Sequence, residues 1–215
     1  MWQLIGSTAR LETPKLNCQL DLKLPVSGLT GVTGALTPKH RFQAPDMSIM
    51  QLMLPVASAP VADTYVRGND LVATFEESTV HRCRTQVYWR IEDESNFCGI
   101  QMIVSVQTSI LDANPGLSVT SKLGRGVQVI DDGIALCSLP DSEVCYVEVA
   151  DSSNVESMIV LNESQITSRL FPGSLEKGVI RRARLLGCFV SGEAADATAR
   201  SIRDEFIRSA PPLTT

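Results

Sequence analysis

The ten residues KLNCQLDLKL, from Lys15 to Leu24, decide the fold class because apolar and polar residues alternate through them without a break. The apolar set is Leu16, Cys18, Leu20, Leu22 and Leu24, and the polar set is Lys15, Asn17, Gln19, Asp21 and Lys23. Successive side chains of a β-strand point to opposite faces of the sheet. The stretch therefore predicts a strand with one buried face and one solvated face.

The same kind of pattern recurs along the chain. Further strands are predicted at 49–54, 71–76, 82–91, 100–111, 126–130, 133–139, 143–149, 157–161, 165–171 and 178–190. Turn residues such as Asn114-Pro115-Gly116 and Asp131-Asp132-Gly133 separate them. Frequent strands without helical patterns between them favour a large, two-sheet antiparallel β-sandwich, whereas the glycine- and proline-containing region 25–48 is expected to be a long loop.

One helix is predicted, at about 192–209, near the C-terminal end of a single β-sandwich domain that spans 1–215. Ser191 is the expected N-cap and Pro211-Pro212 the expected stop. Apolar residues spaced by three or four form one stripe along it, namely Ala195, Ala199, Ile202 and Phe206. A stripe of this kind needs a partner, so the helix is expected to pack on the sandwich.

Composition narrows the possible partners. The 215 residues carry a formal net charge of −5, which argues against nucleic acid because binding to phosphates depends on Lys and Arg. No apolar run approaches the eighteen residues of a membrane span, so no membrane partner is expected. The N-terminal MWQLIGSTARLET lacks the pattern of a signal peptide, which predicts a cytoplasmic protein whose six cysteines are reduced and buried.

The stretch HRCRTQVYWR, from His81 to Arg90, concentrates chemically capable side chains. In an extended chain, alternation divides them between two faces. The predicted outward face holds Arg82, Arg84, Gln86, Tyr88 and Arg90, and the predicted core face holds His81 at its rim, then Cys83, Thr85, Val87, Trp89 and Ile91. Arginine forks with a tyrosine suit an anionic or sugar-like ligand. The alternative is a solvated sheet face whose arginines pair with Glu76, Glu77 or the Glu92–Glu94 cluster.

Other chemistry has less support in the sequence. The two histidines, His40 and His81, lack metal-ligand spacing, so no metal is expected. No phosphate-binding loop or dinucleotide fingerprint is present, so no cofactor is expected. Acid–base catalysis needs only two convergent groups and stays open, without an assigned catalytic residue. Its candidate residues are Glu76, Glu77, His81, Arg84 and Arg90.

Some phrases resemble stretches of uncharacterised bacterial mainly-β proteins: TQVYWR at 85–90, VSVQTSILD at 104–112 and SLEKGVIRRARL at 174–185. The number and length of the strands and the terminal helix also look like the galactose mutarotase-like supersandwiches. That resemblance implies binding or processing of carbohydrates. Mutarotases use catalytic histidines with a glutamate, and the two scattered histidines here do not match that pattern.

Three functions follow as hypotheses. The first is a non-catalytic binding or interaction domain, with a carbohydrate, a small anion or a protein on the outward face of the 82–91 and 100–111 hairpin. The second is a carbohydrate-active enzyme of acid–base type. The third is a self-assembling subunit, in which the acidic segment 126–168 of one chain meets the basic segment 169–184 of another. These opposite charges pair within one chain in the simpler alternative.

Overall fold

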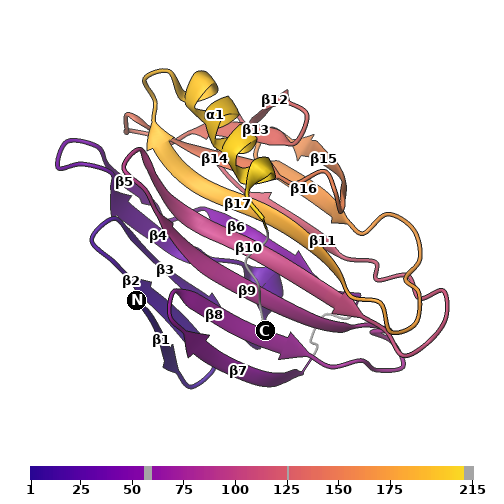
Figure 1. Ribbon diagram of the computed structural model, residues 1–215. Helices are drawn as coiled ribbons and strands as arrows, with labels where there is room; N and C mark the ends of the chain where they lie inside the picture. The colour runs from indigo at the N-terminus through magenta and orange to yellow at the C-terminus, as the bar shows by residue number, and fades with distance from the viewer. Residues whose placement is uncertain (56–59, 125, 211–215) are drawn as a thin grey trace.

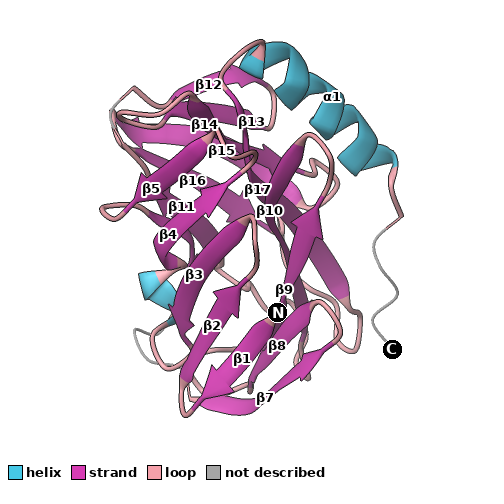
Figure 2. Ribbon diagram, turned by 90° about the vertical axis from the view of Figure 1, so that its left-hand side faces the viewer, coloured by secondary structure: helices cyan, strands magenta, loops and turns pink. Residues whose placement is uncertain are grey.

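The computed structural model describes residues 1–55, 60–124 and 126–210, and consists mainly of antiparallel β-strands with one α-helix near the C-terminal end (Figure 1). The predicted fold class is confirmed. The strands form three hydrogen-bonded sheets in a sandwich-like arrangement, with one large sheet facing two smaller ones (Figure 2).

The large sheet has eight strands in the order β12-β13-β14-β17-β10-β9-β8-β7. Their bounds are β7 Val61–Arg67, β8 Asp70–Phe75, β9 Arg84–Asp93, β10 Phe97–Gln107, β12 Gln128–Asp131, β13 Ile134–Ser138, β14 Val144–Ala150 and β17 Arg181–Ser191. The long hairpin β9–β10 is at its centre, and the predicted pairing of 82–91 with 100–111 is confirmed. All pairings in this sheet are antiparallel.

The opposite layer contains the other two sheets. One has the order β1-β2-β3-β4-β5, with bounds Trp2–Ile5, Thr8–Glu12, Leu16–Asp21, Thr30–Ala35 and Arg41–Ala44. The other has the order β15-β16-β11-β6, with bounds β6 Ser48–Met53, β11 Ser118–Lys122, β15 Val155–Asn162 and β16 Gln165–Leu170. A 3₁₀ turn at Pro25–Ser27 and a β-bridge between Leu29 and Ile49 connect these two sheets.

The main core lies between the layers and receives the predicted inner face of β9. Cys83, Thr85, Val87 and Trp89 are all 0% exposed. Their outward neighbours Arg84, Gln86 and Arg90 keep contact with solvent, so the predicted division of HRCRTQVYWR between two faces is confirmed. His81, predicted at the rim of the core face, is also buried.

The six cysteines are free and buried, as predicted. Across the layers, the ring of Phe42 stacks on that of Phe189 with centroids 4.3 Å apart. The indole of Trp2 donates a hydrogen bond to the carbonyl of Trp89 over 3.0 Å. These contacts join the N-terminal sheet to the long strands of the large sheet.

Helix α1 spans Ala195–Arg208 and packs on the face of the large sheet that points away from the other layer (Figure 2). The predicted stripe is confirmed, since its four residues are buried. Ser191 does not cap the helix: the N-cap is Ala194, whose φ of 55° is left-handed and whose side chain offers no acceptor. The chain turns sharply into the helix there, which leaves Ser191 as the last residue of β17. Pro211 and Pro212 lie outside the described residues.

The expectation of a loop over 25–48 is wrong, because β4 and β5 form within it. Gly34, one of the glycines behind that expectation, lies inside β4. A Cβ there would collide with the carbonyl of Lys15 and the ring of Phe42, so this glycine allows close packing within a sheet. Strands β1, β2, β7 and β11 were also not among those predicted.

Candidate functional site

The outward face of the eight-stranded sheet consists of two unlike halves. Helix α1 contacts β13, β14 and β17 and covers them (Figure 1). We call the outward residues of these three strands the covered half. The outward residues of β7, β8, β9 and β10 form the open half, which α1 does not cover. The predicted ligand surface, the outward side chains of 82–91, belongs to the open half.

The open half contains a hollow of about 590 Å³ at the edge of the sheet, which we call the edge hollow. Its lining includes Tyr65 and Arg67 of β7, Asn69 and Asp70 at the β7–β8 turn, Tyr88, Arg90 and Glu92 of β9, and Val72 of β8. The strand register explains why these charged side chains lie close together. Arg67 pairs with Asp70, and Asp70 pairs with Arg90 across neighbouring strands.

Arg90 and Asp70 form a bidentate ion pair in the edge hollow. Nε of Arg90 donates to Oδ1 of Asp70 over 2.7 Å and Nη2 donates to Oδ2 over 2.8 Å. The hydrogen bond to Asp70 is the main reason that the pKa of Arg90 is raised above its ordinary value. Both side chains are only partly exposed, so their planes are fixed and their remaining polar atoms point to a defined place.

Tyrosine side chains supply the flat part of the edge hollow. Tyr65 is 37% exposed, whereas Tyr88 is 8% exposed and packs with Val72 and Ile103. The hydroxyl of Tyr88 donates to Oε1 of Gln86 over 2.5 Å. These contacts hold the ring of Tyr88 in place without help from a ligand.

Glu92 contributes to the same hollow a carboxyl group whose pKa is raised. Burial raises its pKa above the ordinary value, and the nearby Arg90 opposes that rise only in part. The carboxyl oxygens of Glu92 accept hydrogen bonds, and the guanidinium of Arg90 beside them donates. The edge hollow therefore offers donors, acceptors and ring faces within one recess.

The structure brings together some of the predicted site residues and separates others. Tyr88 and Arg90 both line the edge hollow, and Gln86 holds Tyr88 from behind. Arg84 lies six residues from Arg90, about 20 Å away along an extended strand. Its Nε contacts Oε1 of Glu76 over 3.2 Å, with both side chains about half exposed. That pair matches the alternative in which outward arginines pair with nearby acids.

Of the residues proposed for acid–base catalysis, Glu76 and Arg84 pair with each other. Arg90 binds Asp70 instead of joining them. Glu77 accepts hydrogen bonds from the backbone N–H and the hydroxyl of Ser109, on the surface. His81 is buried, its Nε2 lies 3.0 Å from Oγ1 of Thr85, and burial lowers its pKa. Burial raises the pKa of the nearby Cys83 thiol to about 11, which makes it unreactive at neutral pH.

Tyr65 and Asp70 complete the edge hollow but were missed in the sequence. The sequence predicts no strand over 61–67, and the predicted strand at 71–76 begins after Asp70. The strand register that joins Asp70 to Arg90 links positions twenty residues apart. The alternation in Thr64-Tyr65-Val66-Arg67 was the signal available for β7, and it is short.

A buried carboxyl group, Glu148, was also missed, and it belongs to the core. It is 0% exposed, and its Oε2 accepts hydrogen bonds from Ser121 over 2.5 Å and from Tyr146 over 2.8 Å. Burial raises its pKa. Ser121 comes from the opposite layer and also accepts a hydrogen bond from the backbone of Met50. This network joins the two layers and is closed to dissolved ligands.

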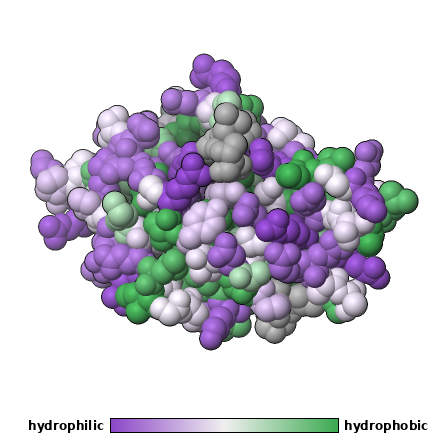
Figure 3. Space-filling view, turned by 60° about the horizontal axis from the view of Figure 1, so that its bottom comes forward, coloured by the Kyte–Doolittle hydropathy of each residue, from purple (hydrophilic) through white to green (hydrophobic). Residues whose placement is uncertain are grey.

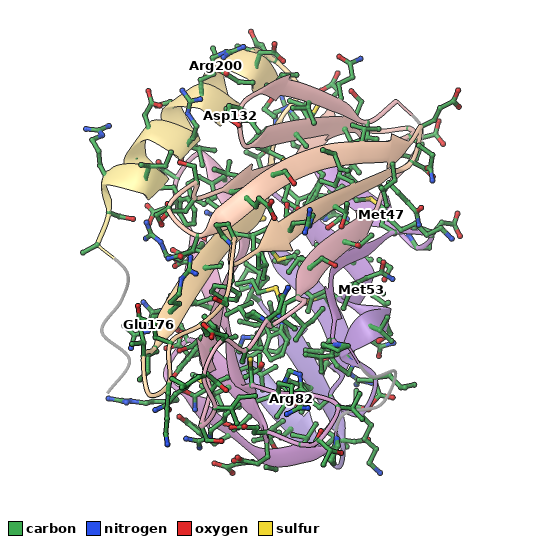
Figure 4. The ribbon with its side chains drawn as sticks, turned by 90° about the vertical axis from the view of Figure 1, so that its right-hand side faces the viewer. Met47, Met53, Arg82, Asp132, Glu176 and Arg200 are labelled. Atoms are coloured by element: carbon green, nitrogen blue, oxygen red, sulfur yellow. The ribbon has the colours of Figure 1, made fainter. Side chains whose placement is uncertain are left out.

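The acidic and basic segments pair within the chain. Arg169 contacts Glu156 over 3.5 Å, and Arg184 contacts Asp151 over 2.6 Å. Arg200 of α1 binds Asp131 beside the turn that carries Asp132 (Figure 4). On the face shown in Figure 3, hydrophobic residues form separate patches among hydrophilic ones. Arg169 and Arg184 of the basic segment thus pair with acids of the same chain, and assembly between chains stays a prediction.

Neither a metal-binding cluster nor a membrane-spanning helix occurs in the part of the chain that the structure describes. No group of three or more His, Cys, Asp or Glu is arranged to hold a metal ion among residues 1–55, 60–124 and 126–210. Within the same ranges, no helix has the length and apolar character to cross a membrane.

Comparison with known proteins gives a structural likeness. No protein-family model matches the sequence, and no curated protein matches it. The fold is similar to part of a solved structure named "Putative kojibiose phosphorylase from human microbiome", with a TM-score of 0.59 and 9% identity. The match covers 95% of this chain and 33% of that chain. This chain thus spans about a third of that protein's length, and at such low identity the likeness concerns the fold alone.

Proposed function

We propose that this protein is a non-catalytic carbohydrate-binding β domain that takes a sugar in the edge hollow. The observation that carries the proposal is the meeting of Tyr65 and Tyr88 with the fixed Arg90–Asp70 pair in one recess. The structural likeness to part of a named carbohydrate phosphorylase supports the same ligand class. A volume of about 590 Å³ lies within the usual range of small-molecule sites.

The residues of the edge hollow suit the two kinds of surface on a sugar. A pyranose ring has apolar C–H faces, which pack on tyrosine rings, and a rim of hydroxyl groups, which both donate and accept hydrogen bonds. Arg90 supplies donors and Asp70 supplies acceptors in a rigid pair. Charged partners form the stronger hydrogen bonds to such hydroxyls.

The balance of charge favours a neutral sugar over a small anion. Arg67 and Arg90 contribute two positive groups to the lining, and Asp70 and Glu92 contribute two carboxyl groups. The bidentate contact with Asp70 occupies two donors of Arg90. An anion would have to displace that pairing, whereas a hydroxyl group can add to it.

One observation favours the enzyme alternative in a revised form. The raised pKa of Glu92 is the property expected of a general acid, and Glu92 lines the edge hollow beside Asp70. In this alternative, Glu92 replaces Glu76, Glu77 and His81 as the candidate acid. Slow cleavage of a glycoside by the wild type, lost in Glu92→Gln, would support it.

Calorimetric titration tests the proposed function. The probes are glucose, galactose, mannose, kojibiose and inorganic phosphate, and the variants are Arg90→Ala and Tyr88→Ala, with Arg84→Ala as the matched control. We expect at least one sugar to bind the wild type and the control alike. Loss of charged hydrogen bonds in Arg90→Ala should weaken that sugar at least tenfold.

The outcomes of this titration are distinct. Binding of phosphate with no sugar response would replace the sugar by an anion. An equal loss of sugar affinity in Arg84→Ala and Arg90→Ala would move the ligand away from the edge hollow. The absence of any sugar binding would overturn the proposed function.

A further inference from the structure

A second hollow adjoins the edge hollow and lies between the end of α1 and the β9–β10 hairpin. Its volume is about 430 Å³, and we call it the helix hollow. Arg90 and Glu92 line both recesses. The two recesses therefore share a wall of Arg90 and Glu92 where the open half meets α1, and a ligand longer than one ring would reach both across that wall.

The helix hollow contains the side chain of Gln101, whose amide faces the recess. Gln101 of β10 is 5% exposed and lines this recess. Among the residues that the structure describes, none forms a hydrogen bond with its side chain. Its amide atoms are not among the fully enclosed ones, so they open onto the recess, and a ligand that brings hydroxyl groups there would bond both the carbonyl and the amino group.

Sheet register places Gln101 where a bound ligand would meet it. Gln101 pairs with Arg90 on one side and with Leu186 on the other, in the row that begins at Arg67 and Asp70. The row thus runs from the edge hollow into the helix hollow. Gln101 follows Arg90 directly, one strand further across the sheet.

The other walls of the helix hollow add apolar and acceptor groups. Phe97 and Phe206 provide aromatic surface, and Glu94 and Glu205 provide carboxyl groups. The guanidinium carbon of Arg184 lies 4.7 Å from the centre of the Phe206 ring, and its Nη2 donates to the carbonyl of Phe206 over 3.1 Å. Phe206 is therefore held in position by the sheet beneath it.

We propose that the helix hollow is a second sugar subsite, so that the open half binds an oligosaccharide of at least two units across Arg90 and Glu92. This inference rests on the proposed function of the edge hollow. The inference narrows the ligand from a sugar in general to an oligosaccharide. A monosaccharide fills one recess and leaves the amide of Gln101 without a hydrogen-bond partner. Gln101 is a specificity-determining residue for the second unit.

The experiment compares chain length by calorimetry. For each hexose that binds, glucose for example, the matching disaccharide and trisaccharide are titrated into the wild type and into Gln101→Leu. We expect the oligosaccharide to bind the wild type at least tenfold more tightly than the single hexose. Gln101→Leu should lose that gain and keep its affinity for the hexose, because the edge hollow is unchanged.

A second variant protects the result against misfolding. Gln101→Met keeps the length of the side chain and removes its amide, and it should behave as Gln101→Leu does. Circular dichroism and a melting temperature at or above that of the wild type establish that both are folded.

Failure of this inference differs from failure of the proposed function. Equal affinity for the hexose and its oligosaccharides, or a gain that persists in both folded variants, would overturn the second subsite and leave the edge hollow standing. Binding of no sugar of any length would overturn both proposals.

Discussion

The covered and open halves of the large sheet belong to the same strand network, yet they present opposite chemistry. Under α1, the outward side chains of β14 and β17 are apolar, as with Val147, Leu186 and Val190. On β9, the outward positions are polar or amphipathic, as with Gln86 and Arg90. A strand whose side chains are apolar on both faces is therefore buried on both faces. A strand in which apolar and polar side chains alternate has one face that is free to contact solvent or a ligand.

Two arginine ion pairs express the same contrast. Arg184 is almost fully buried and binds Asp151 through Nε and Nη2, over 2.9 and 2.6 Å. Arg84 and Glu76 are about half exposed. Solvent screens the second pair but hardly reaches the first, so the two halves should respond very differently to loss of an arginine.

The largest predicted effect is in the covered half. Arg184→Met should lower the free energy of unfolding by about 3–5 kcal/mol, because it leaves the carboxylate of Asp151 buried without its cation. It also removes the donor to the carbonyls of Phe206 and Ser209, at the end of α1. Urea unfolding measures the change, and a loss below 1 kcal/mol would mean that this pair does not anchor the helix.

The helix itself offers a matched pair of variants. Ile202 lies on the buried side of α1 and is 4% exposed, whereas Ile207 on the same helix is 43% exposed. Ile202→Ala should cost about 2–4 kcal/mol through the lost packing and the cavity, whereas Ile207→Ala should stay within about 0.5 kcal/mol. Equal costs in thermal unfolding would contradict the docking of α1 through its stripe.

The pH dependence of stability should also separate the halves. Burial alone would raise the pKa of Asp151, but hydrogen bonds from Ser153 and Arg184 hold it below the ordinary value of 3.8. A carboxyl group of lowered pKa stabilises the fold above its ordinary pKa, and this contribution is lost as the pH falls through the lowered value. In acid titrations followed by circular dichroism, wild type should lose stability below about pH 4, and Arg184→Met should lose less there.

A smaller effect of opposite sign is expected in the open half. Gln101→Leu should raise the free energy of unfolding by about 0.5–1 kcal/mol, because it replaces a mostly buried amide that has no hydrogen-bond partner among the described residues by an apolar side chain of similar size. A binding surface commonly carries such a cost in the absence of its ligand. Destabilisation by this variant in urea unfolding would show that the amide has a partner within the folded protein.

The smallest effect is expected at the exposed pair. Arg84→Ala should change the free energy of unfolding by about 0.5 kcal/mol or less, since exposed ion pairs contribute little. Raising the salt concentration should reduce even that difference. A cost comparable to that of Arg184→Met would remove the distinction between the two halves.

Local pattern predicted the parts of the structure that depend on a single element. The alternation in HRCRTQVYWR assigned the buried face of β9 and the solvated face that holds Arg90. The stripe through Ile202 and Phe206 predicted a docked helix. In both cases one side of one element meets the core, and spacing alone reveals that side.

Relations between elements could not be predicted in this way. The contact of Asp70 with Arg90 depends on strand register, and the burial of Gln101 depends on where α1 ends over the sheet. Gly34 looked like a loop residue because its role, close approach to Lys15 and Phe42, appears only when the strands meet. The site is thus a property of neighbours far apart in sequence.

The most direct test of the central proposal, that the open half of the large sheet is the ligand surface, is an NMR titration of ¹⁵N-labelled protein with the sugar that binds most tightly. We predict shifts in the backbone signals of β7 to β10 around Tyr65 and Tyr88, in Nε–H of Arg90 and in the side-chain amide of Gln101. Shifts confined to β1–β5 in the opposite layer, with the Arg90 and Gln101 signals unchanged at saturation, would contradict the account.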